Sequence, residues 1–83
     1  MTIQNNTFKT KDIFEASWIY SQGALLSHLD PDSDYFWFVF NDQSACQQLS
    51  SDYWTQKATG NIKQFVNSLK TLKDLVFSQK RGN

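Results

Sequence analysis

The sequence predicts one α+β domain in which a small antiparallel sheet carries three helices. Six consecutive apolar residues over 35–40, five of them aromatic, indicate a buried β-strand. Apolar residues that recur every three to four positions over 62–76 indicate a long amphipathic helix. The 83 residues suffice for a single domain, and no linker divides them. We therefore expect one unit over 1–83 with the element order β-α-β-β-α-α, an ordered core over about 7–79, and helices packed on the sheet.

The first predicted elements are a short strand over Thr7–Thr10 and a helix that follows it. Asp12 and Glu15 have the spacing of a capping box, in which side chains satisfy the free amides at a helix start. The helix is expected to end near Gln22, where Gly23 suits the left-handed residue after a helix. Its apolar residues form two faces rather than one stripe.

A β-hairpin is predicted next. Ala24–Leu29 suits a strand, Asp30–Ser33 has turn chemistry, and the aromatic run then forms the second strand. Side chains alternate along a strand, so the aromatic strand has two different apolar faces. One face carries Phe36, Phe38 and Phe40, and the other carries Tyr35, Trp37 and Val39.

Two helices complete the prediction. Asn41 or Asp42 caps a helix that runs to about Trp54, and Asn61 caps the longest helix, which ends near Gln79. The longest amphipathic helix needs the most apolar sheet face, so we expect these two surfaces to pack together. The predicted contact joins Phe36, Phe38 and Phe40 to Ile62, Phe65, Leu69 and Leu72.

The sequence gives no support for catalysis. His28 is the single histidine and lies in a predicted strand; Cys46 is the single cysteine and lies on the apolar stripe of a predicted helix. A nucleophilic thiol needs a base and a lowered pKa. We expect a buried Cys46 that acts as a small hydrophobe and a solvent-facing His28. No phosphate-binding glycine pattern or zinc spacing occurs, so we expect no enzyme, no catalytic residue and no cofactor.

Metal binding and membrane insertion are not expected either. Asp30, Asp32 and Asp34 resemble the first three ligands of a calcium loop, but Tyr35 and Asn41 replace the glycine and glutamate that such a loop requires. The chain contains no apolar run of about 18 residues. Its polar N-terminus lacks the apolar segment of a signal peptide. We therefore expect a cytoplasmic protein with neither a metal nor a membrane partner.

Several short motifs follow one another over 7–77. They are Phe8-x-Thr10-x-Asp12-Ile13, Gly23, Phe38-Val39-Phe40-Asn41-Asp42, Tyr53-Trp54 and Phe65…Leu69-x-x-Leu72-Lys73. In this order, the motifs resemble a family of short, uncharacterised bacterial, cyanobacterial and phage proteins. The resemblance implies a fold unit, a domain of unknown function, and a phage or mobile-element setting. It implies no activity and no catalytic residues.

Candidate binding residues fall into an aromatic set and a basic set. The helix and the aromatic strand each have a second apolar face that one small core does not easily absorb, and these faces predict a surface of Phe14, Trp18, Tyr35 and Trp37. The chain is neutral, but residues 55–83 hold six basic and one acidic side chain. In the last helix, the basic candidates are Lys63, Lys70 and Arg81 on one stripe and Lys73 within the apolar stripe.

These residues predict a small non-catalytic interaction protein that acts through an aromatic surface. Its partner is either a second copy, forming a homodimer, or another protein. The alternative is a nucleic-acid-binding accessory of a phage or mobile element, because exposed rings beside cations bind single strands. Rings flanked by the lysines of the last helix would favour the alternative, and an apolar patch covered by a second copy would favour the first function.

Overall fold

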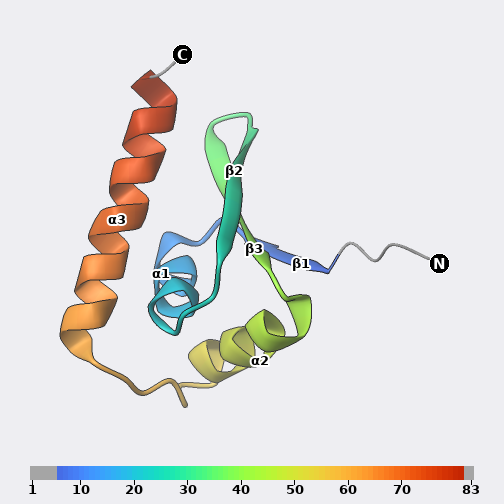
Figure 1. Cartoon of the computed structure of the whole chain (residues 1–83), viewed down its shortest axis with the longest axis vertical. Coiled ribbons are helices and arrows are strands. Elements are labelled where there is room, and N and C mark those ends of the chain that lie inside the picture. The colour runs from blue at the N-terminus through green and yellow to red at the C-terminus, as the bar shows by residue number, and fades with distance from the viewer. Residues whose placement is uncertain (1–5, 82–83) are drawn as a thin grey trace.

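The computed structural model describes residues 6–81 and contains a three-stranded sheet and three helices (Figure 1). The predicted order β-α-β-β-α-α is confirmed. Of the polar N-terminus that precedes the expected core, only Asn6 lies within the described residues. The elements are β1 (Thr7–Thr10), α1 (Ile13–Ser21), β2 (Leu26–Asp32), β3 (Tyr35–Asn41), α2 (Gln43–Trp54) and α3 (Ile62–Arg81).

The aromatic strand β3 is the centre of the sheet, whose strand order is β1-β3-β2 with antiparallel pairing throughout. Phe40 lies opposite Phe8 of β1 and Leu26 of β2, and all three side chains belong to the core. A central strand has neighbours on both edges, so its backbone groups pair along both sides. Helices α1 and α3 lie on the same side of the sheet (Figure 1).

The hairpin turn is later and tighter than the sequence indicated. The prediction of a turn over Asp30–Ser33 is wrong, because β2 continues to Asp32, which pairs with Tyr35. The chain reverses through the two residues between them, and Ser33 has φ of 55°, in the left-handed region. Pro31 fits this strand because β2 is an edge strand, where a missing amide proton leaves no ladder bond broken.

Helix α1 is the central helix of the fold. Ala16 and Ile19 are fully buried in one cluster with Phe38 and Phe40 of β3, and α1 packs against α3 as well as α2. Figure 1 shows α1 between the sheet and α3. A helix with apolar side chains on more than one face needs neighbours on each of those faces. For α1 these neighbours are the sheet, α2 and α3 of the same domain.

The predicted contact between α3 and the aromatic strand is only partly correct. Leu72 is fully buried beside Phe38 and Phe40, and Phe65 packs against that cluster. Ile62, however, is 80% exposed, because α3 packs mainly on α1 and its first turn projects beyond the sheet.

Side-chain caps fix the helix starts as predicted, except that the capping box at α1 is incomplete, because the Asp12 amide donates to Thr10 and not to Glu15. Asp12 accepts from the amides of Phe14 and Glu15, Asp42 accepts from Ala45, and Asn61 accepts from Gln64. Gly23 follows α1 with φ of 97°, a backbone angle that only glycine adopts without strain. No helix among residues 6–81 has the length and apolar character needed to cross a bilayer.

Candidate functional site

The face of the sheet turned away from the helices carries a mixed aromatic and charged surface, which we call the open sheet face. Strand pairing places Lys9 and His28 on either side of Val39, Asp30 beside Trp37, and Asp32 beside Tyr35. Its residues are Lys9 and Lys11 on the β1 side, Tyr35, Trp37 and Val39 on β3, and His28, Asp30 and Asp32 on β2.

Two lysines lie against two aromatic rings on this face. The ring centroids of Tyr35 and Trp37 are 6.1 Å apart with an edge-to-face angle of 75°. The Lys9 ammonium is 4.9 Å from the Trp37 centroid, and the Lys11 ammonium is 4.5 Å from Tyr35 and 5.6 Å from Trp37. These are cation–π distances, so the lysine amines lie over the rings. The rings keep access to solvent, since Tyr35 is 38% exposed.

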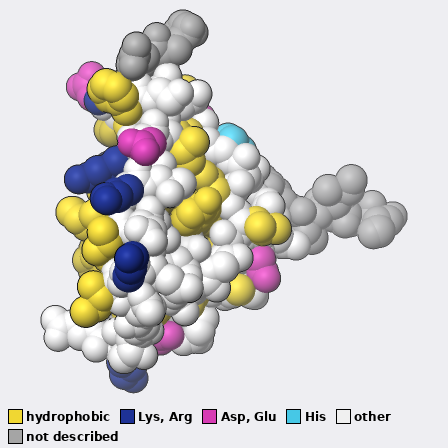
Figure 2. Space-filling model, turned by 60° about the vertical axis from the view of Figure 1, so that its left-hand side comes forward, with side chains coloured by type: hydrophobic (Ala, Val, Ile, Leu, Met, Phe, Trp, Pro, Cys, Tyr) yellow, Lys and Arg dark blue, Asp and Glu magenta, His cyan; other side chains and the backbone are white. Residues whose placement is uncertain are grey.

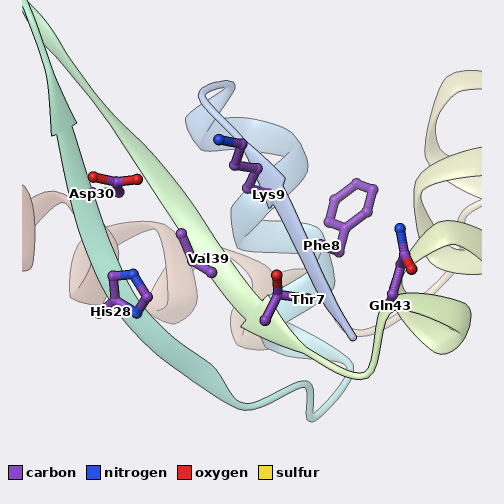
Figure 3. A pocket seen from close by; sticks show the side chains of 7 residues that line it. All are labelled: Thr7, Phe8, Lys9, His28, Asp30, Val39 and Gln43. Carbon is purple, nitrogen blue, oxygen red and sulfur yellow. The ribbon is translucent and has the colours of Figure 1, made fainter. Parts of the chain in front are cut away.

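Asp32 holds the same rings from the opposite side. One carboxylate oxygen accepts from the Trp37 indole nitrogen at 3.0 Å and from the Tyr35 hydroxyl at 3.4 Å. The charges of the face therefore form two rows, with Lys9 and Lys11 on the β1 side and Asp30 and Asp32 on the β2 side. The aromatic row of β3 lies between them, and Figure 3 shows Lys9 and Asp30 on opposite sides of β3.

A hollow of about 520 Å³ extends along this face toward the start of α2. It is wide, its lining is polar and apolar in about equal parts, and it places His28 and Lys9 near Val39 (Figure 3). The lining residues are Thr7, Phe8, Lys9, His28, Asp30, Val39 and Gln43. Lysine, histidine and aspartate in one shallow hollow suit recognition of a partner with both charge signs.

The structure separates the two residues considered for nucleophilic chemistry. His28 is exposed on the open sheet face, where Nδ1 shares a 2.9 Å hydrogen bond with Ser27. Cys46 is fully buried on the helical side, and its thiol donates to the Asn41 carbonyl. Burial, and then the nearby Asp42 carboxylate, raise the pKa of the Cys46 thiol. The thiol is therefore held in its unreactive protonated form.

A buried carboxylate that sequence reasoning missed positions β1. Glu15 is 5% exposed. One carboxylate oxygen accepts from Thr10 at 2.6 Å, and the other accepts from Ser50 and, at 2.9 Å, from Trp54. These bonds join β1, α1 and α2. Thr10 lies between Lys9 and Lys11, so anchoring it on the helical side directs both lysines to the open side. The capping-box spacing identifies Glu15 as a polar residue at the start of α1. It does not predict the bonds to Ser50 and Trp54, because both residues lie far along the chain.

The predicted aromatic surface does not form as one patch. Trp18 is only 8% exposed, and its indole nitrogen donates to the Leu49 carbonyl at 3.1 Å, so its placement on an exposed surface is wrong. The physical reason is that α2 and the loop around Gly60 cover the second face of α1. Phe14 is 50% exposed but lies on the helical side, whereas Trp37 lies on the open sheet face.

The basic candidates on α3 lie among apolar side chains. Lys63, Lys70 and Lys73 are all exposed. Ile62 and Val66 on the same helix are exposed as well, and Figure 2 shows lysines and hydrophobic groups interspersed along this side of the molecule. The side chain of Arg81 lies outside the described residues. Within residues 6–81, Lys9 and Lys11 of the β1 side lie over aromatic rings.

Residues 5–78 match the family described as Domain of unknown function (DUF5659). The chain belongs to this family. Comparisons with curated proteins and with solved structures find no match. The match covers every strand and helix except the last turn of α3.

Proposed function

We propose that this protein is a small non-catalytic interaction protein that binds a protein partner through the open sheet face. The observation that carries the proposal is the pair of solvent-accessible rings, Tyr35 and Trp37, held between lysines and aspartates on a sheet face turned away from the helices. Large aromatic side chains in a fixed geometry are the usual anchors of protein interfaces. Their orientation costs little entropy on binding, because Asp32 already holds both rings.

The charges of the face favour a protein over a nucleic acid as the partner. A polyanion would be attracted by Lys9 and Lys11 but repelled by Asp30 and Asp32 on the same face. A protein surface presents charges of both signs and can match both rows. The Trp37 ring also has a lysine amine above it, so a base would have to displace that amine before stacking.

A cytoplasmic setting belongs to this proposal. Cys46 is a free thiol that is buried and without a disulfide partner, which suits a reducing compartment. A phage or mobile-element setting, which the resemblance implied, remains a prediction.

The test compares two single variants with the wild-type chain. A partner captured from the native host is purified, and its affinity is measured by calorimetry for the wild type, Trp37→Ala and Ile62→Ala. Loss of an interface anchor costs about 2 kcal/mol or more, so Trp37→Ala should weaken binding by about thirtyfold or more. Ile62→Ala removes a more exposed apolar side chain from α3 and should change the affinity by less than about twofold. Equal affinities for Trp37→Ala and the wild type would contradict the proposal.

Nucleic-acid binding remains the second candidate function. The observation in its favour is that lysine amines and aromatic rings lie together on a sheet surface, as in single-strand binding platforms. Lys63 and Lys70 add exposed cations on α3. An oligonucleotide titration separates this function from the first.

A further inference from the structure

The charge rows of the open sheet face are complementary to themselves. Viewed from outside, the face has a cationic row of Lys9 and Lys11, an aromatic row, and an anionic row of Asp30 and Asp32. A second copy, rotated about a two-fold axis along β3 and placed face to face, brings its anionic row over the cationic row of the first. The two aromatic rows then meet at the centre. A two-fold axis across the strands would instead oppose like charges.

We propose that the open sheet face binds a second copy of this chain, with a two-fold axis nearly parallel to β3. This inference rests on the proposed function and names the occupant of the same surface. The two β3 strands run in the same direction, as in aligned packing of two sheets. The interface is isologous, so the contact between a Lys row and the partner's Asp row occurs twice in the dimer.

The edges of the sheet are poor alternatives for self-association. The edge strand β2 contains Pro31 and a register irregularity between Leu26 and His28, both of which interrupt a continuous row of free backbone groups. The other edge, β1, has four residues and ends beside Lys11. Association by strand addition is therefore disfavoured, whereas the face remains accessible.

The exposed side of α3 does not suit a second copy either. It carries Lys63, Lys70 and Lys73, and Asp74 is the single acidic residue within the helix. If two copies packed through this side, the lysines of one α3 would face the lysines of the other, and their repulsion is unfavourable. The open sheet face is therefore the surface on which two copies match.

The size of the face sets the expected strength. A seven-residue strand and two neighbours give an area of about 300 Å² per copy. Typical stable complexes bury about 800 Å² per partner, so this dimer belongs to the weak class. We expect a dissociation constant on the order of 0.1 mM, which places the transition within reach of sedimentation at high concentration.

Charge reversal tests whether opposite charges of the two faces pair across this interface. Lys9→Glu/Lys11→Glu makes the face acidic, and Asp30→Lys/Asp32→Lys makes it basic. In a dimer of two copies of one variant, charges of the same sign face each other. Each variant alone should therefore associate at least about tenfold more weakly than the wild type. An equimolar mixture of the two variants should associate at least as strongly as the wild type. The matched control, Lys63→Glu/Lys70→Glu on α3, should leave association unchanged.

The measurement is sedimentation equilibrium from about 0.02 to 2 mM at low salt, with near-ultraviolet circular dichroism to confirm folding. A wild type that stays monomeric throughout, a mixture that stays monomeric, or loss of association in the α3 control would each overturn the inference. The proposed function is separable from this result. A monomeric wild type whose host partner is lost in Trp37→Ala refutes the dimer only, whereas a partner bound equally by Trp37→Ala refutes the proposed function.

Discussion

Replacing Ser50 by alanine tests the Glu15 hydrogen bonds that anchor β1. The Ser50 hydroxyl donates to a carboxylate oxygen that is buried and also accepts from Trp54. A hydrogen bond to a charged group contributes about 1.5–3 kcal/mol. Serine to alanine within a helix gains about 0.5 kcal/mol of helix propensity. The expected net loss for Ser50→Ala is therefore about 1–2.5 kcal/mol.

Ser51→Ala is the matched control because Ser51 is the next residue of α2 and is exposed. It gains the same helix propensity without losing the bond, so the two variants should differ by about 1.5–3 kcal/mol. For a chain of this length, such a difference corresponds to roughly 6–24 °C in melting temperature. Thermal denaturation followed by circular dichroism measures it. Equal melting temperatures for the two variants would refute the view that Glu15 ties α2 to α1.

Three further predictions concern the core, the thiol and nucleic acid. Phe38→Ala should lower the free energy of unfolding by roughly 3–5 kcal/mol in urea denaturation, because Phe38 is buried in the central cluster; a midpoint near that of the wild type would contradict the packing. Burial raises the pKa of the Cys46 thiol above its ordinary value of 9.0. The unfolded chain therefore loses this proton at a lower pH than the folded chain, so the free energy of unfolding should fall as pH rises through that value. Wild type should thus lose stability relative to Cys46→Ala from about pH 8 to about pH 10, and a constant difference would oppose this. Labelled single- and double-stranded oligonucleotides should not bind at about 0.1 mM protein in low salt; binding abolished by Lys63→Glu/Lys70→Glu would instead support the nucleic-acid function, with a salt slope of about −2.

Local signals in the sequence predicted the helices well. Asp12 and Asn61 were identified as caps because a capping side chain acts on amides within three residues. Gly23 was identified because a left-handed backbone angle strongly favours glycine. The aromatic run predicted a buried strand, because successive apolar residues are typical of a strand that is covered on both faces. The helical face is covered, since Phe38 and Phe40 are buried, whereas Tyr35 on the other face is 38% exposed.

Long-range packing was harder to predict. Trp18 was expected on the surface because periodicity shows that a helix has two apolar faces but not which elements cover them. Glu15 bonds to Ser50 and Trp54, which are 35 and 39 residues further along the chain, so no short spacing reveals the contact. The position of Lys9 above Trp37 depends on the pairing of β1 with β3, which the order of elements does not determine.

The central claim is that the open sheet face binds a second copy of this chain, and a dilution series in ¹⁵N-correlated NMR tests it most directly. Spectra are recorded from about 2 mM down to about 0.02 mM, which spans the expected dissociation constant. The account predicts concentration-dependent shifts for the Trp37 indole and for the amides of Lys9 and His28, while Lys63 and Lys70 on α3 stay unchanged. Shifts confined to α3, or none over the whole range, would contradict it.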